Sequence, residues 1–235
     1  HGTALALDIS GFADYALHQG FELSRVFNCS AEIATERDLR NILGWQHSSF
    51  VRRQLTRPRL ESLRCKGLVV EPHFHYWSGL SEVAPESYLI GYWQSEKYFS
   101  NVEPQIRRDF TFRTPMNSIN ASIAAQIPAV NAVSLHIRRG DYVSDAKAAA
   151  THGLCSIDYY QEAIRYISSK TPDPHFFIFS DDIEWAKENL HIDCHHQYIN
   201  QNHGSESYND MRLMSMCRHH IIANSSFSWW GAWLN

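Results

Sequence analysis

Val133-Ser-Leu-His-Ile-Arg-Arg-Gly-Asp-Tyr-Val143 is the stretch of sequence that decides the fold. It begins as an apolar run of strand length and ends in two adjacent arginines, a glycine and an aspartate. Adjacent guanidinium groups are forked donors that match phosphate oxygens, and a glycine lets the backbone approach a ligand closely. Because ligands bind outside the carboxyl ends of the strands in open α/β sheets, we expect a diphosphate or nucleotide site. Its residues would be His136, Arg138, Arg139, Gly140 and Asp141.

The sequence after this stretch alternates between apolar runs of strand length and amphipathic runs of helix length. The expected strands are residues 132–137, 175–180, 196–199 and 220–223, and the expected helices are residues 157–169, 183–190, 207–218 and 226–234. Regular alternation of this kind predicts a parallel sheet with helical crossovers. Residues 175–180 are continuously apolar, which indicates a strand covered on both faces.

Polar side chains follow a second expected strand, at Ser180-Asp181-Asp182. Asp182 can cap the next helix. The two carboxylates could also bind Mg²⁺ or Mn²⁺, or one of them could accept hydrogen bonds from a base or ribose. A capping Asp182 and a ligand-binding Asp181 are compatible with each other.

A third cluster follows the last expected strand and comprises Asn224, Ser225, Ser226, Phe227 and Ser228. Free backbone N–H groups at the start of the next helix favour an anion there. The plainer alternative is a serine cap with the following tryptophans packed inward.

For the first cluster the plainer alternative is a surface ion pair between Asp141 and one of the arginines. Convergence of all three clusters at one sheet edge favours a ligand site.

The first half of the chain has a less regular pattern. Residues 3–9, 68–77 and 88–92 read as strands, and residues 31–55, 95–110 and 116–127 read as helical. Pro128 ends the last of these helices, so we expect a domain boundary there, with domains at residues 1–128 and 129–235.

Composition narrows the class of protein. The 235 residues are 44% hydrophobic and 20% charged, which is typical of a globular chain, and the net charge of -4 argues against broad nucleic-acid binding. The aromatic content of 13% is compatible with a sugar-binding cleft, but core packing is the commoner explanation. Five scattered cysteines favour a reducing compartment over a disulfide framework. No standard zinc spacing occurs, and no apolar run approaches the ~20 residues that span a bilayer.

The three clusters, in this order, resemble the α-1,2-fucosyltransferases of glycosyltransferase family 11. The matching segments are His136-Ile-Arg-Arg-Gly-Asp-Tyr142, Phe177-Ile-Phe-Ser-Asp-Asp182 and Asn224-Ser-Ser-Phe-Ser-Trp-Trp-Gly-Ala-Trp233. Upstream, Leu7-Asp-Ile-Ser10 and Ile90-Gly-Tyr-Trp-Gln-Ser-Glu-Lys-Tyr-Phe99 are also similar to that family. The family's usual opening glycine-rich segment and its final strand and helix are not in this sequence, so we expect a fragment of a longer protein whose own activity is in doubt.

The resemblance implies an α/β, GT-B-like fold of two Rossmann-like halves with parallel sheets. Residues 1–128 would form an incomplete acceptor-side half, and residues 129–235 would bind the donor nucleotide. The implied enzyme is an inverting galactoside α-1,2-fucosyltransferase with a GDP-β-L-fucose co-substrate, no cofactor and no required metal. Arg138 and Arg139 would bind the diphosphate with His136 beside them, Asp181 or Asp182 the nucleoside, and residues 225–228 the phosphate edge.

The reaction also needs a group that accepts the acceptor's proton. Asp141 is the first candidate and His136 the second, and Arg138 would stabilise the leaving diphosphate. Two other functions stay open from the sequence: a metal-dependent glycosyltransferase using another nucleotide-sugar donor, and a non-catalytic carbohydrate-binding protein.

The cellular setting is also an expectation. The implied partners are a nucleotide sugar and a galactose-terminated glycan, as in O-antigen or lipopolysaccharide synthesis, with no nucleic acid. Free cysteines favour the bacterial cytoplasm, with peripheral membrane association through a lipid-linked acceptor, and the Golgi lumen is the alternative. The pattern does not specify an oligomeric state.

Overall fold

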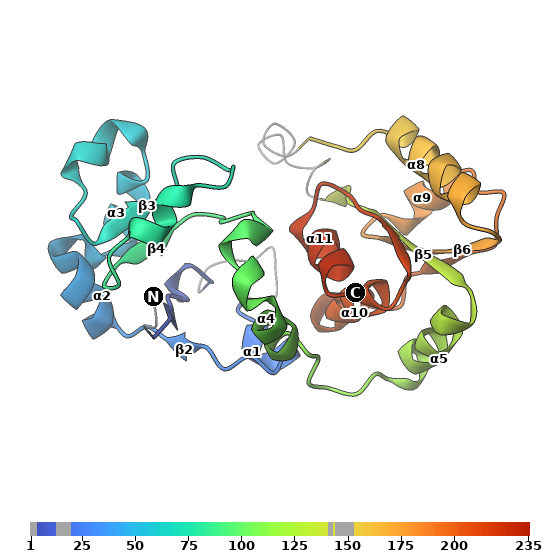
Figure 1. Ribbon diagram of the computed structural model, residues 1–235, viewed down its shortest axis with the longest axis horizontal. Coiled ribbons are helices and arrows are strands. Elements are labelled where there is room, and N and C mark those ends of the chain that lie inside the picture. Colours follow the sequence, from blue (N-terminus) through green and yellow to red (C-terminus); the bar gives the residue numbers. More distant parts are fainter. Residues whose placement is uncertain (1–3, 13–19, 141–142, 144–152) are drawn as a thin grey trace. The chain divides into compact units, whose positions relative to one another are not determined.

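Figure 1 shows the computed structural model of the chain, which describes residues 4–12, 20–140, 143 and 153–235. The chain divides into two compact units, His1–Arg113 and Thr114–Asn235. The division lies upstream of the boundary expected at Pro128. The reason is that helix α5 (Ser118–Gln126) packs into the C-terminal unit, where Ile123 and the adjoining Ile127 join its core.

The C-terminal unit is built on a four-stranded parallel sheet with the order β7-β6-β5-β8. Its strands are β5 (Asn131–Ile137), β6 (Pro174–Ser180), β7 (His196–Ile199) and β8 (His219–Ile221). After α5, its helices are α8 (Ile157–Lys170), α9 (Ile183–Asn189), α10 (Tyr208–Ser215) and α11 (Ser226–Trp233). The predicted alternation of strand and helix in this half is confirmed.

Both faces of this sheet are covered by helices (Figure 1). Successive side chains of a strand point to opposite faces, and β6 shows the consequence. Phe176 and Ile178 pack in a core cluster with residues of α8 and α9, whereas Phe177 and Phe179 pack in a second cluster with residues of α5 and α10. All four β6 side chains have no exposed surface, which confirms the expectation of a strand covered on both faces.

The N-terminal unit contains two separate two-stranded parallel sheets among its described residues. One pairs β1 (Ala6–Leu7) with β2 (Glu32–Ile33), and the other pairs β3 (Leu68–Val70) with β4 (Tyr88–Ile90). Its α-helices in the described residues are α1 (Leu23–Val26), α2 (Glu36–Leu43), α3 (Ser49–Leu55) and α4 (Glu103–Asp109). The α/β class holds for the chain, but a second Rossmann-like half is not confirmed by these sheets.

A buried ion pair ties this unit together. The Arg52 guanidinium on α3 donates to the Asp8 carboxylate at 2.5 Å, and both side chains are at most one-tenth exposed. The Tyr88 hydroxyl donates to the same carboxylate at 2.7 Å. Burial opposes ionisation of Asp8, but the hydrogen bonds from Tyr88 and Ser10 and the Arg52 charge outweigh it and lower the pKa of Asp8. These contacts join segments that are far apart in the sequence.

Several elements of this unit are shorter than expected, including β1 against residues 3–9 and α4 against residues 95–110. The helical pattern of residues 31–55 is divided into β2, α2 and α3, because α2 ends at Gly44, whose φ of 56° is costly for other residues. The strand expected at residues 68–77 ends at Val70. Across the described parts of both units, the helices are all too short or too polar to cross a membrane.

Candidate functional site

The carboxyl ends of β5, β6 and β8 bring the three polar clusters to one edge of the C-terminal sheet. Ile137 lies opposite Ser180 in the β5–β6 register, and Leu135 lies opposite Ile221 in the β5–β8 register. The segments that follow each strand are therefore neighbours at the edge where open α/β sheets bind ligands. The predicted convergence of the clusters is confirmed by the sheet topology.

The arginines of the first cluster are held by the aspartates of the second. Arg138 Nη1 lies 2.8 Å from Asp181 Oδ2, and Arg139 Nε donates to Asp182 Oδ2 at 3.1 Å. The Arg139 backbone N–H also donates to Asp181 Oδ1 at 2.8 Å. Partly exposed pairs contribute little to stability on average. Their main effect here is to fix the direction of two guanidinium groups at the sheet edge.

Two further residues fix this geometry. The Arg139 guanidinium carbon lies 3.8 Å from the centroid of the Trp185 ring on α9, which is a cation–π contact. A Cβ atom at Gly140 would lie 2.6 Å from Asp181 Oδ2, so a larger residue at this position would displace that carboxylate from its present place. Sequence reasoning identified Gly140 but missed Trp185. The sequence feature that could have indicated Trp185 is its position in the first turn of the helix that Asp182 caps.

His136 lies on β5, two residues before Arg138, and is almost completely buried. Burial, with the nearby positive charge of Arg138, lowers the pKa of His136 to about 3, so the imidazole is neutral near pH 7. Its Nδ1 atom is buried and has no hydrogen-bond partner among the described residues. A neutral, buried imidazole is a poor general base, because it binds a proton weakly and has little access to solvent.

The second cluster also starts a helix. The Asp182 carboxylate accepts a hydrogen bond from the Trp185 backbone N–H at 3.3 Å, so Asp182 is the N-cap of α9 as expected. The Ser180 hydroxyl accepts from the Asp182 backbone N–H at 2.9 Å. Asp182 thus caps the helix with one oxygen and holds Arg139 with the other.

In the third cluster the residues have different roles. Ser225 is the N-cap of α11 and accepts from the Phe227 backbone N–H, and Ser226 is exposed at the start of that helix. The Phe227 ring packs 5.7 Å from the His136 ring, which links this cluster to the first. Ser228 is fully buried and its hydroxyl donates to the carbonyls of Ala223 and Ser225. It supports the first turn of α11, and its expected role at the phosphate edge stays a prediction.

Asn224 is anchored to the segment before α8. Its amide nitrogen donates to the Gly153 carbonyl at 2.9 Å, and its amide oxygen accepts from the Cys155 thiol at 3.6 Å. Asp141, the first candidate for the proton acceptor, lies outside the described residues. Among the residues that the structure describes, no group of three or more His, Cys, Asp or Glu side chains could hold a metal ion. All five cysteines are free thiols.

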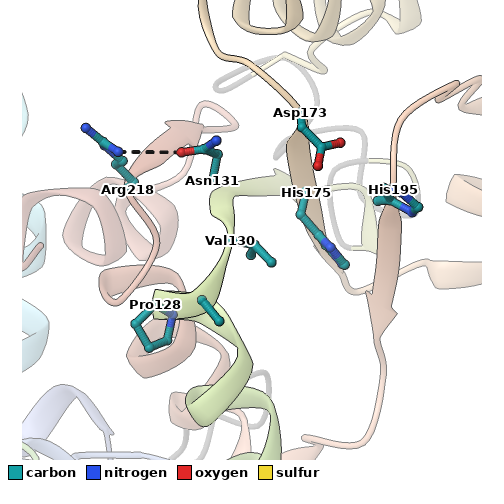
Figure 2. Close-up of a pocket in the computed structure, with 8 residues that line it drawn as sticks. Pro128, Val130, Asn131, Asp173, His175, His195 and Arg218 are labelled. Carbon is teal, nitrogen blue, oxygen red and sulfur yellow. Dashed lines mark hydrogen bonds between the residues drawn. The ribbon is translucent and has the colours of Figure 1, made fainter.

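A separate pocket of about 360 Å³ lies at the opposite edge of the same sheet, where the strands begin (Figure 2). Asn131 opens β5, His175 is near the start of β6, and Arg218 donates to Asn131 Oδ1 at 3.5 Å. Because ligands of open parallel sheets bind at the carboxyl ends of the strands, this pocket is not the predicted nucleotide site.

Known proteins similar to this chain are glycosyltransferases, which is consistent with a ligand site at the carboxyl edge of the sheet. The chain matches a family model described as glycosyl transferase family 11 over residues 76–235. It is 37% identical over 236 aligned positions to an alpha-1,2-colitosyltransferase of Escherichia coli, covering 99% of this chain and 78% of that protein. It is 30% identical to the O-antigen biosynthesis glycosyltransferase WbnK of Escherichia coli, covering 99% of this chain and 80% of that protein.

A more distant relative is the human galactoside alpha-(1,2)-fucosyltransferase 1, which is 25% identical over 154 aligned positions. That alignment covers 62% of this chain and 42% of the human protein. No solved structure matches the chain significantly. The family match spans more than half of the chain, and two relatives of at least 30% identity align along nearly all of it. The chain therefore belongs to glycosyltransferase family 11.

Proposed function

We propose that the protein transfers L-fucose from GDP-β-L-fucose to the 2-hydroxyl of a terminal β-galactoside, with inversion at the fucosyl carbon. The single observation that carries this proposal is the arrangement of Arg138 and Arg139 by Asp181 and Asp182 at the carboxyl edge of the sheet. A guanidinium has five N–H donors in a fixed planar arrangement, so a carboxylate that orients it also orients the donors that a diphosphate would meet. The family relationship supports a sugar nucleotide as that anion.

The proposed chemistry follows from where charge develops. When the bond between the fucosyl carbon and the diphosphate breaks, negative charge accumulates on the departing GDP. Cationic groups that are already in place stabilise that charge in the transition state without reorganising. Arg138 and Arg139 have this role in the proposal, and Trp185 keeps the Arg139 guanidinium in position.

The acceptor hydroxyl attacks the fucosyl carbon from the face opposite the departing GDP and gives up its proton late in bond formation. We assign that proton to Asp141 in preference to His136. The preference rests on the burial of His136 and on its low pKa of about 3.

Colitose is the second candidate for the transferred sugar. The relative with 37% identity is named an alpha-1,2-colitosyltransferase, whereas the named fucosyltransferase in the comparison is 25% identical. Both sugars would be carried by the same nucleotide in this proposal, so the arginine site does not distinguish them. The similarity to an O-antigen biosynthesis glycosyltransferase supports a bacterial acceptor glycan, which would be lipid-linked and would place the enzyme at the membrane surface.

The test is a transfer assay with GDP-fucose and GDP-colitose as alternative donors and a panel of β-galactosides as acceptors. We expect transfer to a galactoside, with excess EDTA having no effect, because Asp181 and Asp182 are engaged by arginines. GDP is expected to raise the melting temperature. Loss of activity in EDTA would instead support a metal-dependent enzyme, and sugar binding without any GDP effect would support a carbohydrate-binding protein.

Arg138→Ala is the matched variant for this test. Losing a preorganised donor at the leaving group is expected to lower kcat/KM by roughly 100-fold or more. Arg165→Ala, at an exposed position of α8, removes the same charge elsewhere and is expected to leave transfer unchanged. Circular dichroism checks that both variants are folded. Near-normal turnover in folded Arg138→Ala would remove the arginine site from the mechanism.

A further inference from the structure

Six aromatic rings gather at the carboxyl ends of strands β3 and β4 in the N-terminal unit. These strands are parallel, and Val70 lies opposite Ile90 at their ends. The segment after β3 and the segment after β4 each supply three rings. We call this cluster the aromatic platform, and its residues are Phe74, Tyr76, Trp77, Tyr92, Trp93 and Tyr98.

The two segments interlock through their rings. The ring centroids of Phe74 and Tyr92 are 5.6 Å apart, and those of Tyr76 and Tyr98 are 5.0 Å apart. Trp77 stacks on Trp93 at 6.5 Å with an interplanar angle of 28°. The Tyr98 hydroxyl also accepts a hydrogen bond from the Trp77 backbone N–H at 2.8 Å. These contacts make one continuous surface from two segments.

The backbone under the platform is held in an unusual conformation. Trp93 has a φ of 51°, a region that bulky residues rarely adopt. The Glu71 carboxylate accepts the backbone N–H groups of Tyr92 at 2.6 Å and Trp93 at 3.1 Å. A Cβ atom at Gly91 would lie 2.4 Å from Glu71 Cβ, so the contact also requires a glycine. Strained residues held by their surroundings are concentrated at functional sites.

The outer rings of the platform are exposed. Phe74 is 61% exposed, Tyr76 43% and Tyr92 67%. Contiguous exposed apolar surface with a polar rim is typical of ligand and interaction sites. The Glu71 carboxylate accepts hydrogen bonds from the backbone, and the Lys97 ammonium lies 5.6 Å from the Tyr76 centroid. The surface is thus aromatic, with several exposed ring faces inclined to one another.

We infer that the aromatic platform binds the pyranose ring of the acceptor galactoside. A β-galactoside is neutral, and one face of its galactose ring carries the C–H groups of carbons 3, 4 and 5 without a hydroxyl between them. Such a face packs on an aromatic ring, and the remaining hydroxyls can bond to phenol and indole groups at the rim. This inference rests on the proposed function, because the galactoside is the acceptor in that reaction.

The direct test is saturation-transfer NMR with lactose, using wild-type protein and single variants. Transfer is expected to the galactose protons on carbons 3, 4 and 5. Tyr92→Ala and Phe74→Ala are expected to lose it, whereas Tyr92→Phe retains the ring and keeps it. Phe50→Ala is the matched control, because Phe50 is 69% exposed on α3 and is not part of the platform. Unchanged transfer in both alanine variants would overturn the inference.

Steady-state kinetics give a second measurement, because a binding defect raises KM for lactose whereas partial unfolding lowers the apparent kcat. Tyr92→Ala is expected to raise KM for lactose about tenfold while kcat changes less than about threefold. The Kd for GDP, measured by calorimetry, is expected to stay at the wild-type value in every variant. A fall in kcat with unchanged KM would contradict a binding role for the platform.

Two outcomes of these binding measurements distinguish a failure of this inference from a failure of the proposed function. If wild-type protein binds GDP but gives no saturation transfer with lactose, the platform inference fails and the donor site stands. If GDP does not bind but lactose binding depends on Tyr92, the donor proposal fails and the platform stands. The platform could instead bind a second copy of the chain, and analytical ultracentrifugation tests this by measuring self-association. Self-association that Tyr92→Ala abolishes would identify the platform as a surface between copies and overturn the inference.

Discussion

At the residue scale, the site depends on which carboxylate each arginine meets. The sequence offered Asp141 as an ion-pair partner for Arg138 or Arg139, because it is close along the chain. The structure pairs Arg138 with Asp181 and Arg139 with Asp182. These partners come from the neighbouring strand, and their proximity follows from the β5–β6 register, which no local pattern encodes.

Gly140→Ala tests this arrangement without removing any charge. The new Cβ would lie 2.6 Å from Asp181 Oδ2, so that carboxylate must move and weaken its hold on Arg138. We expect the melting temperature to change little, because a side-chain end can rotate away. The Kd for GDP, measured by calorimetry, is expected to increase several-fold, on the scale of one weakened charged contact. Wild-type affinity for GDP would contradict a positioning role for Asp181.

Asp210→Asn tests a buried carboxyl group away from the arginines. Asn202 donates to Asp210 Oδ1 at 2.7 Å and also bonds to Asn120, so the group belongs to a buried polar network between α5 and α10. Burial raises the pKa of Asp210 from 3.8 to about 7, although the hydrogen bond from Asn202 opposes this shift. Between these values the folded state binds more protons than the unfolded state, so this residue makes stability fall as pH rises.

The variant should therefore be more stable than wild type at pH 8, by an amount of order 1 kcal/mol or more, and close to wild type near pH 4. The asparagine oxygen can still accept the hydrogen bond from Asn202. Urea unfolding at both pH values provides the measurement. Asp193→Asn, at an exposed position between α9 and β7, is the control and is expected to show no such difference. Equal stabilities at pH 8 would show that Asp210 titrates normally.

At the scale of elements, the sequence determined the C-terminal unit well and the N-terminal unit poorly. Strands β5, β6 and β7 and helices α8, α9 and α11 lie close to their expected bounds, because each combines clear periodicity with a cap or a turn residue. In the N-terminal unit the strands are two or three residues long, which is too short to show a period. The expected helix at residues 31–55 failed because Gly44 ends α2.

Asp182→Asn separates two roles of one residue at the start of α9. Asparagine and aspartate cap helices about equally well, so the free energy of unfolding is expected to change by only a few tenths of a kcal/mol. The negative charge that holds Arg139 at 3.1 Å is lost, so the Kd for GDP is expected to increase. Asp182→Ala is the comparison, and it is expected to lose both functions, with roughly 1 kcal/mol of stability. If Asp182→Asn binds GDP normally, Trp185 alone suffices to position Arg139.

At the scale of the whole molecule, the two units carry different kinds of surface. The C-terminal unit presents charged groups at the carboxyl edge of its sheet, and the N-terminal unit presents the aromatic platform at the carboxyl ends of β3 and β4. In both units the surface follows parallel strands at the edge where such sheets place ligands. In our proposals the C-terminal unit binds the sugar-nucleotide donor and the N-terminal unit binds the acceptor galactoside.

Hydrogen exchange tests where the donor binds in the intact chain. GDP is expected to slow exchange in the segments that follow β5, β6 and β8, and to leave β3 and β4 unchanged, because the proposed contacts are confined to that sheet edge. Mass spectrometry of peptides from protein with and without GDP gives the comparison. Protection centred on the pocket of Figure 2, near Asn131 and His175, would place the nucleotide at the wrong edge for this proposal.

The sequence by itself determined the order of strands and helices after Pro128 and the residues at the end of each strand. Local periodicity and caps are properties of a few consecutive residues, so they can be read without the fold. Only the tertiary structure decided that Asp181 and Asp182 hold the arginines and that His136 is buried and neutral. It alone also decided that the aromatic rings are exposed. These properties depend on strand order and on burial, which arise from contacts between residues distant in the sequence.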